Sequence, residues 1–432
     1  MDRRSFVAAL LAAPLCQVRR VCGQTNDLTA LTIAEASRRL ASRSLTPLQL
    51  TNAYLSRIGV VNKQLNAYVT VTTDLARREA RALGDKPRGA MWGIPIAHKD
   101  LLETKGVRTT AGSMLFDQHV PDTNAAIVQQ LEDAGAVLLG KTNTHELGGG
   151  VTTINPFYGT TRNPVDATRI PGGSSGGSAA AVVARLCAAA TGSDTGGSVR
   201  IPAAFCGCVG YKPTHGKFST QGLIAASPTF DHIGFLTRTV EDAQLIAGLA
   251  TGQIEKPRIA IARNFFFANL EPEVAAAFAA LKYPDIEFPV DANTRGRVFD
   301  PVFTFEMWGR FGPDWRTSPG SFSKAMAEFF LTPRPAIAEY EDALAALKEY
   351  QAAVDKLFDQ VDVIITPTVP MVAPPVAGPI DGMKILRNTW PFNAAGTPAI
   401  SIPAKTTGLP VGIQLVAKRG EDDKLLQIAR AF

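Results

Sequence analysis

The stretch RIPGGSSGGSAAAVVARLCAAATGSDTGGSVRIPAAFCGCVGYKPT, residues 169–214, decides how this chain folds. It holds two clusters of glycine and serine, GGSSGGS at 172–178 and DTGGS at 194–198, and the alanine-rich run between them predicts a helix. Glycine lets the backbone take positive φ and approach another group closely, so the N–H groups can converge on a developing negative charge. Each cluster alone also fits a flexible turn. Together they indicate serine side chains held in glycine turns for chemistry.

A third motif, WGIPIAHKD at 92–100, predicts a buried strand that ends on a lysine, Lys99. Burial of an ammonium group is costly, so this lysine needs an explanation. One interpretation is a salt bridge to the neighbouring Asp100 or to another carboxylate. The other is a desolvated lysine whose lowered pKa leaves it neutral and able to accept a proton.

These motifs together resemble the amidase signature family, serine hydrolases that cut carboxamides with a Ser, cis-Ser, Lys triad. The resemblance begins near Thr32, is dense over 93–242, and returns at DVIITPTVP (362–370) and NTWPFNAAGTPAISIP (388–403). It implies an α/β fold with a mixed central β-sheet flanked by α-helices on both sides. It also implies hydrolysis of a small-molecule carboxamide without metal or cofactor, and esters, aryl amides and carbamates present the same carbonyl.

The resemblance assigns a role to each residue that matches the family's motif. Ser198 is expected to be the nucleophile, Ser174 the serine that follows a cis peptide bond, and Lys99 the neutral base. No histidine lies in or beside either serine cluster, which independently favours a lysine base. The expected oxyanion donors are the backbone N–H groups of Thr195, Gly196, Gly197 and Ser198.

Other residues are expected to support this machinery. Ser175 and Asp194 would orient the two glycine loops, and Arg200 would anchor the nucleophile turn. The glycines Gly148, Gly149 and Gly150 are candidates for the border of the substrate pocket, or form a flexible turn. The segment 251–335 is short for the family, and we expect its part from Asp291 to about Pro335 to cover the pocket and to carry specificity.

Two further enzyme interpretations are open. In the first, GGSSG at 172–176 is the G-x-S-x-G elbow of an α/β hydrolase with Ser174 as nucleophile, but that motif needs a strand directly before it, and NPVDATRIP precedes it here. In the second, GAVLLGKT at 135–142 is a phosphate loop that binds nucleotide through Lys141. Its intervening Ala, Val, Leu and Leu suit a buried strand better.

Two alternatives keep the family's scaffold and change the function. A tRNA-dependent amidotransferase A-type subunit would depend on partner proteins, and a non-catalytic protein would bind an amide without cutting it. An export signal counts against the first, because aminoacyl-tRNA stays in the cytoplasm. The retained serines and lysine count against the second.

Residues 1–23, MDRRSFVAALLAAPLCQVRRVCG, have the charged-then-apolar order of an export signal, and the paired arginines resemble the bacterial twin-arginine type. This predicts an exported, periplasmic protein with one catalytic domain over 24–432. A disordered amphipathic leader, and so a cytoplasmic protein, is the alternative. A lipoprotein site at Cys16 matches poorly.

Composition excludes several other classes. The net charge is +5, of which residues 1–23 account for +3, so the remainder is too weakly basic to indicate a nucleic-acid partner. After the signal no apolar run is long enough to span a membrane. The five histidines form no H-E-x-x-H motif or cluster, so no metal site is expected. The oligomeric state stays open, with a homodimer among the options.

Cysteine usage predicts no disulfide framework. Two of the five cysteines lie in the expected signal, and the other three are an odd number without zinc spacing. We expect Cys187, Cys206 and Cys208 to be free and buried.

Periodicity predicts alternating helices and strands. Helix is expected from Leu28 to about Asp85, with a capping box at Thr32 and an N-cap at Thr46 that is followed by proline at the first helical position. From 291 to 335 the pattern is too weak to assign. Further helices are expected at 123–136, 239–252, 271–282, 336–358 and from 422. Strands are expected at 137–140, 258–262, 286–290, 362–366, 399–403 and 411–417.

Overall fold

The computed structural model of the chain describes residues 27–84, 87–250 and 256–432. The export signal predicted for residues 1–23, with its two cysteines, lies outside the described residues. None of the helices among the described residues has the length and apolar character needed to cross a bilayer.

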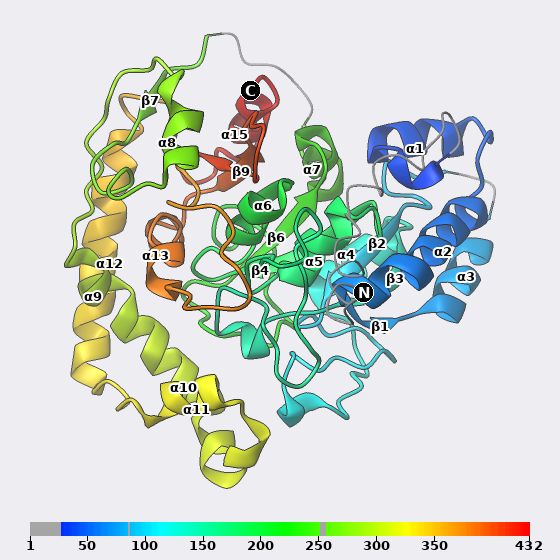
Figure 1. Cartoon of the computed structure of the whole chain (residues 1–432), viewed down its shortest axis with the longest axis horizontal. Coiled ribbons are helices and arrows are strands. Elements are labelled where there is room, and N and C mark those ends of the chain that lie inside the picture. Colours follow the sequence, from blue (N-terminus) through cyan, green and yellow to red (C-terminus); the bar gives the residue numbers. More distant parts are fainter. Residues whose placement is uncertain (1–26, 85–86, 251–255) are drawn as a thin grey trace, which may run out of the picture.

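A ten-stranded mixed sheet runs through the centre of the molecule (Figure 1). Its strands are β1 (Tyr68–Val71), β2 (Pro95–Lys99), β3 (Val137–Thr142), β4 (Ala189–Asp194), β5 (Val209–Lys212), β6 (His232–Thr237), β7 (Ile259–Ile261), β8 (Val363–Pro367), β9 (Ala399–Pro403) and β10 (Gly412–Val416). Their order in space is β1-β3-β2-β4-β6-β5-β9-β10-β8-β7. β2 pairs in parallel with both β3 and β4, whereas β6 pairs antiparallel with β4 and β5, so the predicted mixed sheet is confirmed.

Helices surround this sheet, as the fold prediction required (Figure 1). The α-helices are α1 (Ile33–Ala41), α2 (Pro47–Leu65), α3 (Thr73–Ala82), α4 (Ala126–Asp133), α5 (Gly176–Val183), α6 (Arg200–Cys206), α7 (Val240–Ala247), α8 (Pro272–Ala279), α9 (Thr294–Val298), α10 (Asp300–Thr317), α11 (Lys324–Leu331), α12 (Ile337–Leu357), α13 (Gly382–Leu386), α14 (Trp390–Ala394) and α15 (Asp422–Ala429). Short 3₁₀ turns are η2 (Leu28–Ala30), η3 (Met114–Phe116), η4 (Glu146–Gly148) and η5 (Pro319–Ser321).

The predicted helix starts in the N-terminal region are confirmed. Thr32 accepts from the Glu35 N–H at 3.1 Å while the Glu35 carboxylate accepts from the Thr32 N–H at 2.9 Å, which closes a capping box. Thr46 makes the same arrangement with Gln49. The helical expectation for this region is wrong at Tyr68–Val71, because the four residues YVTV are aromatic or β-branched and pair with β3 as strand β1.

Two other segments depart from the sequence-based expectation. The alanine-rich run is helical only to Val183, and its second half enters strand β4 at Ala189. The strand expected at 286–290 is absent from the structure, where only Asp285 makes an isolated bridge to Ile261.

The segment without a clear pattern, 291–335, contains α9, α10 and α11. α10 was hard to recognise because it includes Gly309, Gly312 and Pro313, residues that count against a helix interior. Burial of an apolar face compensates for that low propensity: Met307 and Phe311 are buried on it.

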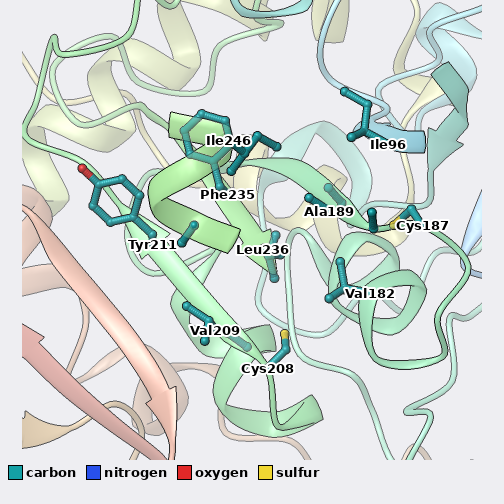
Figure 2. Packing of buried hydrophobic residues seen from close by; sticks show 14 of the residues in the cluster. Ile96, Val182, Cys187, Ala189, Cys208, Val209, Tyr211, Phe235, Leu236 and Ile246 are labelled. Carbon is teal, nitrogen blue, oxygen red and sulfur yellow. The ribbon is translucent and has the colours of Figure 1, made fainter. Parts of the chain in front are cut away.

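The largest apolar cluster among the described residues packs helices against the sheet. Figure 2 shows part of it, with side chains from β2, β4, β5, β6, α5, α7 and the segments before β4 and β5 in one cluster: Ile96, Val182, Cys187, Ala189, Cys208, Val209, Tyr211, Phe235, Leu236 and Ile246. The cysteine prediction is confirmed for the described residues, since Cys187, Cys206 and Cys208 are free and buried.

Residues 137–142 of the GAVLLGKT motif form strand β3 rather than a phosphate loop. Lys141 is fully buried, and its Nζ donates to the Leu102 carbonyl at 2.7 Å and to Thr109 Oγ1 at 2.6 Å. Asp100 lies 3.5 Å from the same nitrogen. The nucleotide interpretation is therefore wrong, because the buried Lys141 ammonium interacts with groups inside the protein and cannot reach a phosphate.

Gly140 gives the first testable prediction. Its φ is +148°, and a Cβ there would lie 2.1 Å from the Thr70 carbonyl oxygen on β1. We expect Gly140→Ala to lower the free energy of unfolding by at least about 2 kcal/mol in a urea titration. In the matched control, Gly59→Ala in α2, a Cβ meets nothing within 4 Å, and we expect a gain of about 0.5–1 kcal/mol. Equal effects of the two substitutions would contradict this account of β1 and β3.

Candidate active site

Lys99 stands at the end of β2, fully buried, beside the first serine cluster. Its Nζ lies 2.7 Å from Ser174 Oγ and 2.8 Å from Ser193 Oγ. The salt bridge considered between Lys99 and Asp100 does not form, because Asp100 pairs with Lys141 at 3.5 Å. The lysine is thus surrounded by hydroxyl groups.

Burial lowers the pKa of Lys99 to about 7, and the carboxylates of Asp194 and Asp231 offset part of that shift. At neutral pH a large share of the lysine is therefore the free amine, which can accept a proton. The neighbouring His145 is also neutral, because burial and the Lys99 charge lower its pKa to about 4. The site thus holds a base without a permanent positive charge.

Ser174 follows a cis peptide bond, Gly173–Ser174, as the family resemblance implied. Its carbonyl oxygen accepts from the His145 N–H at 3.1 Å, Thr144 Oγ1 at 3.0 Å and Thr153 Oγ1 at 3.3 Å. Three donors on the Ser174 carbonyl fix the backbone directly after the cis bond, while the Ser174 side chain lies against Lys99.

The elbow interpretation of GGSSG lacks its structural context. Residues 171–173 before Ser174 are irregular, and α5 begins only at Gly176. A G-x-S-x-G nucleophile requires a strand directly before the serine. Ser174 therefore does not occupy an α/β-hydrolase elbow.

Ser198 lies in the turn between β4 and α6 and is 6% exposed. Its carbonyl oxygen accepts from the Ser175 N–H at 3.1 Å, so the backbone connects the two glycine-serine clusters. Ser175 Oγ also donates to the Ser193 carbonyl at 3.2 Å. The side chains of Lys99 and Ser174 are joined directly by a hydrogen bond. Ser198 is connected to this cluster by the hydrogen bond between its carbonyl oxygen and the Ser175 N–H.

The turn before Ser198 needs glycine. Gly197 has φ of +143°, and a Cβ there would lie 2.1 Å from Thr389 Oγ1. The Thr389 hydroxyl donates to the Gly196 carbonyl at 2.6 Å. A side chain at Gly197 would displace Thr389 and disturb the backbone N–H groups beside Ser198.

Asp194 and Arg200 hold the two ends of that turn. Arg200 donates to both Asp194 oxygens, at 3.0 and 2.8 Å, and Asp194 Oδ2 accepts from the Val199 N–H at 3.1 Å. Both side chains are fully buried. Burial alone would raise the pKa of Asp194, but the Arg200 guanidinium holds it below its usual value. Asn393 and Gln414 bond the same guanidinium at 2.6 and 2.7 Å.

Several residues of this network were missed in the sequence. Ser193 precedes Asp194 on β4 and accepts from Lys99, while Thr191 Oγ1 accepts from the Lys99 N–H at 3.3 Å. Alternate strand residues share a face, so the hydroxyls at 191 and 193 in TGSD were a usable signal. Asp231 accepts from Thr195 Oγ1 at 2.5 Å, and burial raises its pKa to about 6.

The glycines at 148–150 lie beside the catalytic candidates. A Cβ on Gly148 would lie 3.7 Å from Ser174 Oγ. One on Gly149 would lie 2.9 Å from Met326 Sδ in α11. No cluster of His, Cys, Asp and Glu that could hold a metal ion occurs within 27–84, 87–250 and 256–432.

Comparison with known proteins agrees with this geometry. The Amidase family pattern matches residues 49–264 and 325–426. A curated relative, the A-type subunit of glutamyl-tRNA(Gln) amidotransferase from Syntrophus aciditrophicus, is 34% identical over 94% of this chain and 97% of its own length. The chain therefore belongs to the amidase signature family.

Solved structures give the same result. A crystal structure of an amidase matches with a TM-score of 0.85 and 33% identity, covering 92% of this chain and 98% of that one. The A-type subunit of glutamyl-tRNA(Gln) amidotransferase from Thermotoga maritima matches with a TM-score of 0.76 and 30% identity, covering 95% and 96%. Each match extends over nearly the whole length of the solved chain, so this chain has the same overall fold as both proteins.

The buried pair of Asp194 and Arg200 gives a second prediction. We expect Arg200→Met to lower the free energy of unfolding by about 3–5 kcal/mol, because it leaves a buried carboxylate without its cation. The control, Arg263→Met, breaks an ion pair with Asp285 whose side chains are 42% and 65% exposed, and we expect a loss below about 1 kcal/mol. Urea unfolding of both variants checks this, and similar losses would contradict it.

Proposed function

We propose that this chain is a serine amidohydrolase that cleaves a carboxamide through an acyl-enzyme on Ser198. The observation that carries the proposal is the 2.7 Å contact between Lys99 Nζ and Ser174 Oγ in a fully buried position. A neutral Lys99 amine that is hydrogen-bonded to the Ser174 hydroxyl can act as a base, and the hydroxyl can pass it a proton.

The proposed reaction has two halves, acylation of Ser198 and hydrolysis of the resulting ester. In each half one bond to the carbonyl carbon forms, another breaks, and a proton is relayed through Ser174. Ser198 Oγ attacks the amide carbonyl carbon while its proton passes to Ser174 and the Ser174 proton passes to Lys99. When the C–N bond breaks, Lys99 returns a proton through Ser174 to the leaving nitrogen, and an ester on Ser198 remains. Water then attacks this ester with the same relay, and it releases the carboxylic acid and regenerates the serine.

The tetrahedral intermediate carries an oxyanion that needs donors. We assign this role to the backbone N–H groups of Thr195, Gly196, Gly197 and Ser198. Support comes from the constraint at Gly197, where the position of a Cβ is occupied by Thr389. Asp231 holds the Thr195 side chain at 2.5 Å and so supports the first of these donors.

One observation favours a second candidate, a tRNA-dependent amidotransferase subunit. The Syntrophus relative that carries that name is 34% identical. We favour the hydrolase because the similarity in fold to the solved amidase, TM-score 0.85, exceeds that to the Thermotoga protein, 0.76. The export signal proposed for residues 1–23, which would place the protein in the periplasm, points the same way.

Covalent labelling tests the proposed nucleophile. We expect a fluorophosphonate to form one adduct on Ser198, located by peptide mass spectrometry. Lys99→Met should abolish labelling and lower kcat/KM for amides by about 10²–10⁴-fold, because the base is gone. The control, Lys63→Met on the exposed face of α2, should leave both unchanged. An adduct on Ser174 or Ser175 would contradict the assignment.

The pH dependence of turnover tests the base. Lys99 acts as the free amine, and its pKa is about 7, so kcat/KM should be low in acid and rise through about pH 7. Asp231→Asn removes a negative charge that raises the Lys99 pKa, so it should move this midpoint to lower pH. A profile that is flat through neutrality, or a midpoint that Asp231→Asn shifts upward, would contradict the proposal.

A further inference from the structure

The segment that the family pattern leaves unmatched, 265–324, supplies most of one wall beside the candidate active site. Along α10 and the residue before it, apolar side chains recur at every fourth position, at Phe299, Phe303, Met307 and Phe311. This spacing places them on one face of the helix. Met326 of the adjoining α11 joins Met307 in the same buried cluster.

The glycine loop at 148–150 brings this wall to the proton relay. A Cβ on Gly148 would lie 3.7 Å from Ser174 Oγ. A Cβ on the next residue, Gly149, would lie 2.9 Å from Met326 Sδ and 3.4 Å from Met307 Cε. Two consecutive glycines therefore separate the relay serine from two methionine side chains.

The same wall also reaches the nucleophile turn. A Cβ on Gly196 would lie 3.0 Å from Leu386 Cδ1 and 3.4 Å from Phe299 Cζ. Phe299 stacks on Phe303, with ring centroids 5.9 Å apart and planes inclined by 8°. The apolar surface thus extends past both serine clusters. We define Phe299, Phe303, Met307, Met326 and Leu386 as the apolar wall.

Charged residues next to the wall in sequence are hydrogen-bonded to partners in the protein. Beside Leu386, Arg387 donates to Asn388 Oδ1 at 3.0 Å and to the Phe266 carbonyl at 3.4 Å. Glu306 accepts from Thr229 Oγ1 at 2.5 Å and from Tyr340 Oη at 3.1 Å. Asp300 pairs with Arg295 at 2.8 Å.

Glu146, next to the glycine loop, is likewise occupied. It accepts from Ser113 Oγ at 2.9 Å and from the Ser323 N–H at 3.1 Å. A charged substrate group placed against the apolar wall would lose its hydration without gaining a counter-ion from these residues, which is unfavourable.

From this arrangement we infer that the substrate is a carboxamide whose substituents are uncharged and apolar, alkyl or aryl, and that Met307 and Met326 limit their size. The inference rests on the proposed amidohydrolase function and names its substrate class. Methionine has three rotatable bonds and adapts its shape to different apolar groups, so these side chains can yield to a substrate. A free amino-acid amide such as glutamine, with its ammonium and carboxylate, does not fit this wall.

The test compares N-acyl p-nitroanilides that differ in charge and length. We expect kcat/KM for the hexanoyl compound to exceed that for the glutaryl compound, of similar length but anionic, by at least about 100-fold. Among primary amides, we expect hexanamide to exceed glutamine by a similar factor. Equal or faster turnover of the charged compounds would overturn the inference. Turnover of no compound, together with no fluorophosphonate adduct on Ser198, would instead contradict the proposed function.

Variants of the wall test the size limit. Met326→Ala and Met307→Ala should each raise kcat/KM for a phenylhexanoyl anilide relative to the acetyl anilide by about 10-fold or more. Gly149→Ala, whose new methyl group points at Met326, should shift the same ratio in the opposite direction. Met114→Ala, 45% exposed and distant in sequence, is the matched control with no shift. An unchanged ratio of the two kcat/KM values in Met326→Ala, Met307→Ala and Gly149→Ala would overturn the role of the methionines.

Discussion

The site depends on the burial of one amine. Lys99 has no exposed surface, and its Nζ is bonded to two serine hydroxyls. Removal from water disfavours the ammonium form, and the two carboxylates in its vicinity restore only part of the lost stability of that form. The result is a pKa near neutrality, where a base is most useful. A lysine in water would stay protonated and could not accept the serine proton.

A second constraint keeps the nucleophile turn in a fixed geometry. The turn is anchored at both ends by the buried pair of Asp194 and Arg200, and Asn393 and Gln414 extend this network to the C-terminal half of the chain. Asn393 and Gln414 follow Arg200 in the sequence by 193 and 214 positions, and the fold brings both to its guanidinium. Such a network stabilises only when every member is satisfied, so it couples the nucleophile turn to the C-terminal segments.

The sequence allowed the sheet class, the flanking helices and the three catalytic candidates to be predicted, because glycine clusters and a lysine-ended strand are local signals. It did not reveal Asp231, because a carboxylate in FDHIG becomes informative only when folding places it 2.5 Å from Thr195. α10 was missed for a different reason: its glycines and Pro313 lower the helix propensity, and tertiary burial of Met307 and Phe311 overrides that. The apolar wall could therefore not be predicted from the sequence, although residues 291–335 were expected to cover the pocket.

The central claim is that burial lowers the Lys99 pKa to about 7, so that a large share of this lysine is the free amine at neutral pH. Nuclear magnetic resonance of protein with ¹⁵N-labelled lysine measures this directly, with the Lys99 signal assigned from its loss in Lys99→Met. In protein whose Ser198 is replaced by alanine, the account predicts that the assigned Lys99 Nζ signal titrates with a midpoint near the pKa of about 7. A Lys99 signal that stays protonated until the pH approaches its ordinary pKa of 10.5 would contradict it.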